Sequence, residues 1–270
     1  MEELEAVDRY NQRVDACKDD ELRGILAHNR DEEMEHAAMV LGWIRRRSPA
    51  LSVHRQTTDP RLRKTNTMSM PQFATGNAKL TAADLFSLEQ YTAARNELRA
   101  QAVAHKNKRR LALGDHLTLL FEDRITMQYQ IQEMLRVEKI FEQTGIEDEL
   151  GAYNPLIPDG CNFKATMLIE YSDVEQRRVA LGKLIGIEDR IFVQIDGHDP
   201  VFAIADDDLE RSTEEKTSAV HFLRFELDAE MIAALKSGAK LSAGVDHPHY
   251  PCQPVIIASA MQESLVNDLA

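Results

Sequence analysis

The stretch RIFVQIDGHDPVFAIAD, residues 190–206, indicates the fold class of most of this chain. It contains two short apolar segments, RIFVQIDG and VFAIAD, and its Asp196-Gly197 pair favours a tight reversal of the backbone between them. Further strand-like segments are HLTLLFED (116–123), TMLIEY (166–171), AVHFLRFEL (219–227) and KLSAGVD (240–246). Several of these strands follow one another directly, which favours antiparallel pairing. The sequence therefore predicts an α+β domain with a mainly antiparallel sheet.

Helices are expected around these strands. The expected ranges are 81–106, 125–143, 173–185, 228–237 and 255–269, with Thr81 as the N-cap of the first. Before them, residues 48–79 contain three prolines and many polar residues without a hydrophobic period, which predicts a linker. We therefore divide the chain into residues 1–47, a linker at 48–79 and the α+β domain at 80–270.

The composition of the 270-residue chain is that of a globular protein, with 43% hydrophobic and 29% charged residues. No apolar run approaches the ~20 residues that span a bilayer, so no transmembrane helix is expected. The N-terminus, MEELEAVDRY, does not resemble a signal peptide, and the three cysteines form no CxxC pair, so a cytoplasmic location is expected. The net charge of −13 argues against a nucleic-acid partner.

Residues 1–47 predict two antiparallel helices that form a hairpin. The first runs from residue 2 to 16, and the second ends at the three arginines before Ser48-Pro49. Steps of four and three residues place a polar group within each apolar stripe. The stripe of the first helix is Glu3, Val7, Tyr10 and Val14, and that of the second is Leu22, Leu26, Asn29, Glu33, His36, Val40 and Trp43. Polar groups on a buried face are costly unless something satisfies them.

A metal site would satisfy these groups. Glu3 and Glu33 lie about equally far, roughly 22 Å, from the turn between the helices, so they meet in the hairpin. One Glu from one helix and a Glu-x-x-His, here Glu33 and His36, from its neighbour make half of the di-iron site of four-helix bundles. The chain has no second Glu-x-x-His, so the other half must come from a second copy. Alternatively, EEMEH is a solvated acidic face with a chance histidine.

The runs MEELEAVDRYNQRVDA and ELRGILAHNRDEEMEHAAMVLGWIRRR strongly resemble the encapsulated ferritins, which are ferritin-like cargo proteins of encapsulin shells. The resemblance implies Fe(II) oxidation at a di-iron site shared between two chains, within dimers assembled into a ring. It implies Glu3, Glu33 and His36 as ligands, with Glu2 and Glu5 at the iron entry and Tyr10 beside the site. Three departures from the family are expected to matter. Family members carry more chain before the point that matches Met1, so the start looks truncated, Arg9 stands where the family has Trp, and the chain end SLVNDLA is unlike the family's shell-targeting peptide.

The runs LTAADLFSLEQY, KRRLALGDHLTLLFEDRITMQYQIQEMLRVEKI, YNPLIP, KTSAVHFLRFEL and GVDHPHY resemble a bacterial domain family of unknown function. Its genes often lie near those of a rubrerythrin and an iron–sulfur oxidoreductase, which implies iron or peroxide metabolism. Two alternatives to iron oxidation stay open. The chain is an adaptor that docks a rubrerythrin-type redox partner and uses the hairpin for dimerisation, or the α+β domain has an enzyme activity of its own.

Three further patterns in the second domain have two interpretations each. The polar residues of 122–139, including Gln128, Gln132 and Glu133, line a ligand cleft or form ion pairs on an amphipathic helix. The run HPHYPC at 247–252 offers His247, His249 and Cys252 to a metal or forms a rigid turn, and His247 is the stronger candidate. The basic run HKNKRR at 105–110 binds phosphate or is a solvated helix end.

Overall fold

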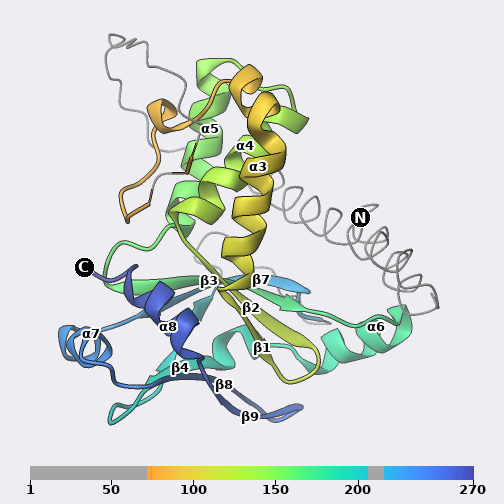
Figure 1. Ribbon diagram of the computed structural model, residues 1–270. Coiled ribbons are helices and arrows are strands. Elements are labelled where there is room, and N and C mark those ends of the chain that lie inside the picture. Colours follow the sequence, from red (N-terminus) through yellow and green to blue (C-terminus); the bar gives the residue numbers. More distant parts are fainter. Residues whose placement is uncertain (1–71, 74, 206–215) are drawn as a thin grey trace, which may run out of the picture.

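The computed structural model describes residues 72–73, 75–205 and 216–270 (Figure 1). The predicted helical hairpin and most of the predicted linker lie outside these residues. The described part has two antiparallel sheets packed on each other and a layer of helices above the larger sheet. The prediction of an α+β domain with antiparallel sheets is therefore confirmed. Across the described ranges, no helix combines the length and apolar character needed to cross a membrane.

The larger sheet has five strands in the order β1-β2-β3-β7-β6, and every neighbouring pair is antiparallel. Its strands are β1 (Arg110–Leu113), β2 (Leu117–Glu122), β3 (Asn162–Ile169), β6 (Ile204–Ala205) and β7 (Val220–Glu226). The smaller sheet has the order β5-β4-β8-β9. Its strands are β4 (Ile191–Ile195), β5 (Val201–Phe202), β8 (Leu241–His247) and β9 (Tyr250–Ile256).

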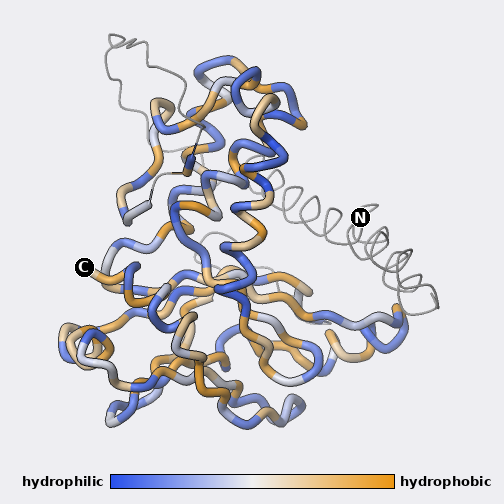
Figure 2. Tube along the Cα trace, in the orientation of Figure 1, coloured by the Kyte–Doolittle hydropathy of each residue, from blue (hydrophilic) through white to orange (hydrophobic). Residues whose placement is uncertain are grey.

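The main core lies between the two sheets. On β2 the alternate residues Leu117, Leu119 and Phe121 point into it. Their paired residues on β3 also belong to this core. Apolar residues of β4 and β8 close the core from the other side. In Figure 2 the strands carry mostly apolar residues, whereas α3 and α4 alternate between polar and apolar ones. The alternation of core residues along β2 is the period-two pattern expected of strands that bury one face.

The helical layer consists of α3 (Leu88–Asn107), α4 (Arg124–Val137) and α5 (Gln143–Tyr153) (Figure 1). A second core holds it together, with Met127, Ile131 and Met134 of α4 against Leu150 and Tyr153 of α5. Shorter helices flank the sheets or connect the elements. They are the 3-10 helices η2 (Ala82–Asp84), η3 (Asn154–Leu156) and η4 (Ile187–Arg190), and the helices α6 (Val174–Lys183), α7 (Ala229–Lys236) and α8 (Ser259–Val266).

The opening stretch folds partly as predicted, because VFAIAD was expected as one strand and instead forms β5 in the smaller sheet and β6 in the larger one. β4 and β5 pair as a hairpin with Phe192 opposite Phe202, and Gly197 takes the left-handed conformation, with φ 84°, in the connection. Other boundaries were wrong. The predicted helix 125–143 ends at Val137 because Lys139 has a φ of 54°, outside the helical region, and α5 starts separately. Thr81 precedes only a 3-10 turn, and Ser87 caps α3.

Two strands were missed. Residues 250–256 form β9, where the predicted last helix was to begin, and α8 covers only 259–266. β9 contains Pro251 and Pro254, and it lies at the edge of the smaller sheet, where prolines are tolerated. The four-residue β1 was not predicted, and only Lys108 and Arg109 separate it from α3.

The end of the predicted linker lies against the helical layer. The ring of Phe73 is 6.3 Å from that of Phe86 and 6.4 Å from that of Tyr129. The Lys79 ammonium donates to the carbonyl oxygen of Ile157 at 2.6 Å. Residues 75–79 connect the contact of Phe73 with that of Lys79. We call them the strap.

Candidate functional site

The predicted iron ligands Glu3, Glu33 and His36 lie outside the described residues, as do Glu2, Glu5 and Tyr10. Their arrangement therefore stays a prediction. Within the described ranges, no group of three His, Cys, Asp or Glu side chains is placed to hold a metal ion.

The HPHYPC run forms the turn between β8 and β9. The imidazole of His247 has Nε2 3.3 Å from the carbonyl oxygen of Ile185, and its Nδ1 accepts the backbone N–H of His249 at 3.2 Å. The rings of His247 and His249 are 5.9 Å apart, and the Cys252 thiol donates to the carbonyl oxygen of Gln253. These bonds tie the three residues into the hairpin.

A group of buried charges surrounds Arg109, which lies two residues after the end of α3 and is 1% exposed. Its Nε donates to the carbonyl oxygen of Phe121 at 2.9 Å, and its Nη2 donates to that of Glu122 at 3.2 Å. Its Nη1 donates to Oγ of Ser264 at 3.0 Å. The guanidinium therefore joins the end of β2 to α8.

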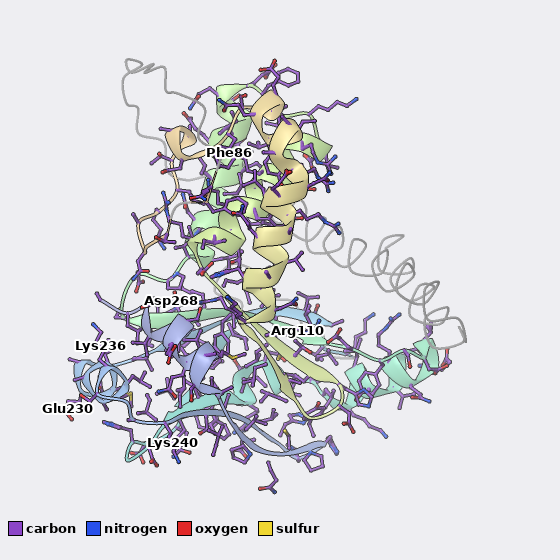
Figure 3. The ribbon with its side chains drawn as sticks, in the orientation of Figure 1. Phe86, Arg110, Glu230, Lys236, Lys240 and Asp268 are labelled. Atoms are coloured by element: carbon purple, nitrogen blue, oxygen red, sulfur yellow. The ribbon has the colours of Figure 1, made fainter. Side chains whose placement is uncertain are left out.

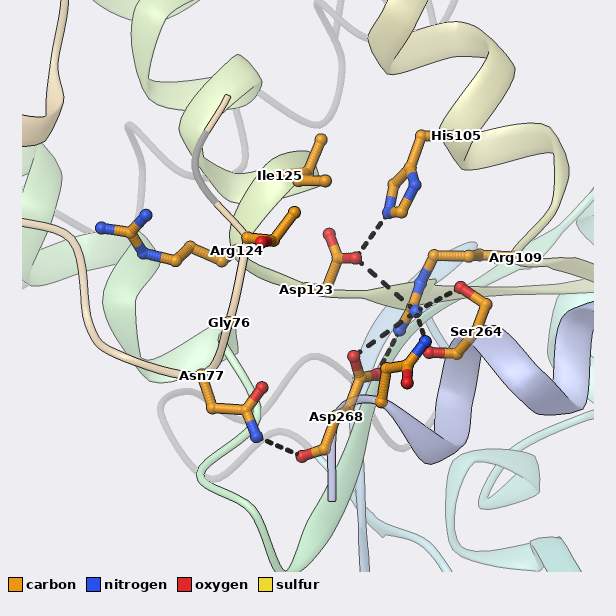
Figure 4. Close-up of a pocket in the computed structure, with 11 residues that line it drawn as sticks. Gly76, Asn77, His105, Arg109, Asp123, Arg124, Ile125, Ser264 and Asp268 are labelled. Atoms are coloured by element: carbon orange, nitrogen blue, oxygen red, sulfur yellow. Dashed lines mark hydrogen bonds and ion pairs between the residues drawn. The ribbon is translucent and has the colours of Figure 1, made fainter. Parts of the chain in front are cut away.

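Two buried carboxylates flank this guanidinium (Figure 4). Asp268 binds Nη2 of Arg109 directly, and Asp123 has Oδ2 3.5 Å from Nη1. The other oxygen of Asp123 accepts the backbone N–H of Thr126, so Asp123 is also the N-cap of α4. His105, in the last turn of α3, places Nε2 2.5 Å from Oδ2 of Asp123.

A cavity of about 400 Å³ opens beside this cluster. Four segments surround it, namely the strap, the end of α3, the start of α4 and α8. The lining residues are Thr75, Gly76, Asn77, His105, Arg109, Asp123, Arg124, Ile125, Ser264, Asn267 and Asp268. Figure 3 shows Asp268 at the junction between the helical layer and the sheets. We call this cavity the strap pocket.

The two carboxyl groups of the cluster have opposite pKa shifts. For Asp123, burial favours the neutral form, but the hydrogen bond from His105 and the charge of Arg109 outweigh it and lower the pKa. For Asp268, burial raises the pKa to about 6 against the charge of Arg109, and the negative charge of Asp123 adds to the rise. Two carboxyl groups with pKa values moved apart, in a cavity, are typical of sites that bind or exchange protons.

The polar residues of α4 bind groups of the neighbouring segments. The amide of Gln128 donates to the carbonyl oxygen of Asp84, and that of Gln132 accepts the backbone N–H of Phe86. Glu133 binds Arg95 through both oxygens, at 2.9 and 2.8 Å, and accepts the hydroxyl of Tyr91. The interpretation as an ion-paired helix is therefore correct. The ion pairs join α4 to α3, and the amide hydrogen bonds join it to the segment before α3.

The basic run 105–110 is not one surface. Arg109 is buried, Arg110 lies beside Glu170 at 3.2 Å, and His105 contacts Asp123. Arg109, Asp123 and Asp268 were not predicted as a group. One local signal for the burial of Arg109 was present. Arg109 lies at the same alternate positions as Leu111 and Leu113, which are the buried residues of β1.

Two family models match the chain. The model of proteins of unknown function (DUF3501) covers residues 79–269, and a model described as EncFtn-like covers residues 1–58. A crystal structure of a protein of unknown function from Burkholderia pseudomallei shares 55% sequence identity and a TM-score of 0.68. The similarity covers 72% of this chain and 100% of that one.

The N-terminal segment has its own relatives. An encapsulated ferritin-like protein from Rhodospirillum rubrum is 65% identical over 57 residues, which are 21% of this chain and 41% of that protein. A ferritin-like protein from Thermotoga maritima is 65% identical over 48 residues, which are 18% of this chain and 42% of that protein. The matched segment thus spans about two fifths of each of these relatives.

The DUF3501 model matches well over half of the chain, and the Burkholderia protein is similar over its whole length. The chain therefore belongs to the DUF3501 family and carries an EncFtn-like segment before its family domain.

Proposed function

We propose that the chain handles iron, and that residues 1–47 form half of a centre that oxidises Fe(II). The observation that carries this proposal is the EncFtn-like match over residues 1–58, which spans Glu3, Glu33 and His36. The 65% identity to the encapsulated ferritin-like protein of Rhodospirillum rubrum lends further support. A second copy of the chain supplies the other half of the centre.

The donor set fits iron. Two copies together offer four carboxylates, from Glu3 and Glu33, and two imidazoles, from His36, which is the di-iron set of four-helix bundles. Each of two Fe(II) ions gives up one electron, and O₂ takes both electrons with two protons to leave as hydrogen peroxide. The protein holds the two ions side by side and balances their charge. Glu2 and Glu5 attract further cations to the entrance.

The test is aerobic Fe(II) oxidation by the full chain, followed by the absorbance of Fe(III). The wild type is expected to oxidise iron faster than buffer, whereas Glu33→Ala and His36→Ala fall to the buffer rate. Glu35→Ala is the matched control, because Glu35 lies off the predicted stripe and its loss leaves the rate unchanged. If all four proteins show the same slow background rate, the proposal is wrong.

Oligomeric state separates this function from the adaptor alternative. A centre split between two chains should tighten the dimer when Fe(II) is added, and purified protein should hold about one iron per chain. Light scattering after size-exclusion chromatography, with and without Fe(II), measures the first, and metal analysis the second. Dimers that form without iron and hold none would instead support a dimerisation element in an adaptor.

A further inference from the structure

The strap pocket has the size and construction of a small-molecule site, and none of its lining residues is a predicted iron ligand. Its volume of about 400 Å³ falls in the range of roughly 300–1,000 Å³ typical of ligand cavities. Segments from both ends of the described chain build its walls, from Thr75 in the strap to Asp268 after α8. Four of the lining side chains are charged and largely buried, namely Arg109, Asp123, Arg124 and Asp268.

The guanidinium of Arg109 has no donor left for a ligand. A guanidinium has five N–H groups. Five hydrogen bonds occupy them, to the carbonyl oxygens of Phe121, Glu122 and Ser264, to Oγ of Ser264 and to Oδ2 of Asp268. Arg109 therefore acts as a fixed counter-charge within the wall of the pocket, and not as a binding site for an anion.

The pocket has a surplus of negative charge. Arg124, the other lining cation, is compensated by Asp84 at 2.6 Å and by the carbonyl oxygen of Ala78 at 2.9 Å. Arg109 thus faces two carboxylates, Asp123 and Asp268, with only the imidazole of His105 nearby. Apart from that imidazole, the two carboxylates exceed the guanidinium by one negative charge. Asp268 lines the pocket, and the hydrogen bond from Arg109 to its Oδ1 is long, at 3.5 Å.

Neutral acceptors line the same pocket. The amide of Asn77 donates its Nδ2 to the backbone oxygen of Asp268 at 2.6 Å, which orients the side chain and leaves its Oδ1 as an acceptor. The side chains of Thr75 and Asn267 also line the cavity and are exposed to solvent. A pocket lined by one such carboxylate and by amide and hydroxyl oxygens matches the three N–H donors of a primary ammonium.

We propose that the strap pocket binds a small organic cation through a primary ammonium group, with Asp268 as its counter-charge and Asn77 and Asn267 as acceptors. A metal ion is the poorer fit, since the described residues hold no group of three metal-ligating side chains placed to bind one. An anion fits worse, because every donor of Arg109 is engaged and two carboxylates face the cavity.

Protons compete with the cation at this site. Burial raises the pKa of Asp268 to about 6, so the carboxyl is largely protonated below that pH. The other charged groups around it are Arg109, Asp123 and Arg124, and the imidazole of His105 lies against Asp123. Affinity should therefore fall about tenfold or more from about pH 7.5 to about pH 5.

The test uses the full chain and three probes of equal length, which are butylamine, butanol and butyrate. Isothermal titration calorimetry measures binding at about pH 7.5 and about pH 5. Butylammonium is expected to bind at least tenfold more tightly than the other two, and more weakly at the lower pH. The proposal is overturned if butanol or butyrate binds equally well, or if none of the probes binds at about 10 mM.

Variants locate the site. Asp268→Asn should abolish binding and its pH dependence, with circular dichroism to check that the fold is kept. Asn267→Ala changes an exposed side chain, so it should keep the fold and weaken binding several-fold. Asp246→Asn is the control, because this exposed carboxylate on β8 lies outside the pocket lining and should leave the affinity unchanged. Equal weakening by Asp246→Asn would place any binding elsewhere.

Discussion

Arg109 and Asp268 form a buried ion pair although 159 positions separate them in the chain. Their exposed fractions are 1% and 5%. The pair fastens the end of the chain, after α8, to the start of the larger sheet, and the backbone oxygen of Asp268 holds Asn77 of the strap. Asp268 thus joins three segments around the strap pocket.

Arg109→Met should lower the free energy of unfolding by about 3–5 kcal/mol, the usual cost of removing one partner of a buried pair. Methionine fills much of the volume, but Asp123 and Asp268 then stay buried without their shared cation. Urea denaturation followed by circular dichroism measures the change at neutral pH. Arg110→Met is the matched control, because the exposed pair with Glu170 should contribute less than about 1 kcal/mol.

Asp268→Asn should cost less than Arg109→Met. Arg109 keeps Asp123 as a partner, and the amide replaces a carboxyl whose pKa of about 6 shows that burial opposes its ionisation. A raised folded pKa means that the stability due to this group is fully present below its unfolded pKa and is lost as pH rises through about 6. The wild type should therefore lose stability relative to Asp268→Asn between about pH 4 and pH 6. An equal or larger cost at every pH would contradict this account.

Glu133 should give the opposite pH dependence. Burial favours its neutral form, but hydrogen bonds from Arg95, Arg136 and Tyr91 outweigh this and lower the pKa to about 2. A lowered folded pKa contributes stability above the unfolded value, which is lost as pH falls from about 4.5 to about 2. Glu133→Gln should cost about 2 kcal/mol at neutral pH, and the difference from wild type should shrink steadily in acid. Thermal unfolding across that range provides the measurement, and a pH-independent difference would refute it.

The fold could be predicted where local pattern decides it. The alternation in RIFVQIDG and the Asp196-Gly197 turn are properties of neighbouring residues, and they gave β4 and β5 correctly. Lys139 shows the limit, because nothing in its neighbours distinguishes a left-handed break from continuing helix. β9 shows another, since its two prolines are compatible with a strand only at a sheet edge, and the edge is defined by long-range pairing.

The strap pocket could not be predicted because its residues come together only in the folded chain. In sequence, Arg109 looks like the end of a solvated basic run and Asp268 like a terminal acidic residue. Burial and pairing give them their properties, and both depend on how α8 packs on the sheet. The only local signal was the parity of Arg109 with Leu111 and Leu113, which marks the position but gives no partner.

Gly244 of β8 lies under the ring of Phe192 on β4. A Cβ atom at this glycine would come within 2.5 Å of Phe192 Cζ, so the ring must move to admit it. Gly244→Ala should therefore lower the free energy of unfolding by about 1–3 kcal/mol. In the background of Phe192→Ala the same change should cost close to nothing, because the clash is gone. A double-mutant cycle by urea denaturation measures the coupling, and additive effects would show that the ring is not the obstacle.

Cys161 should react slowly with alkylating reagents even though it is exposed. Its thiol donates to Oδ1 of Asp159 at 3.1 Å and lies 3.8 Å from Oε2 of Glu226. The hydrogen bond to Asp159, with burial and the two negative charges, raises the pKa of Cys161 to about 11. Since the thiolate is the reactive form, iodoacetamide at about pH 8 should modify it at least tenfold more slowly than in the urea-unfolded chain. Asp159→Asn removes the main cause and should restore much of the rate, whereas Asp246→Asn should not. Peptide-resolved mass spectrometry follows Cys161 alone, and rapid labelling in the wild type would rule out this role of Asp159.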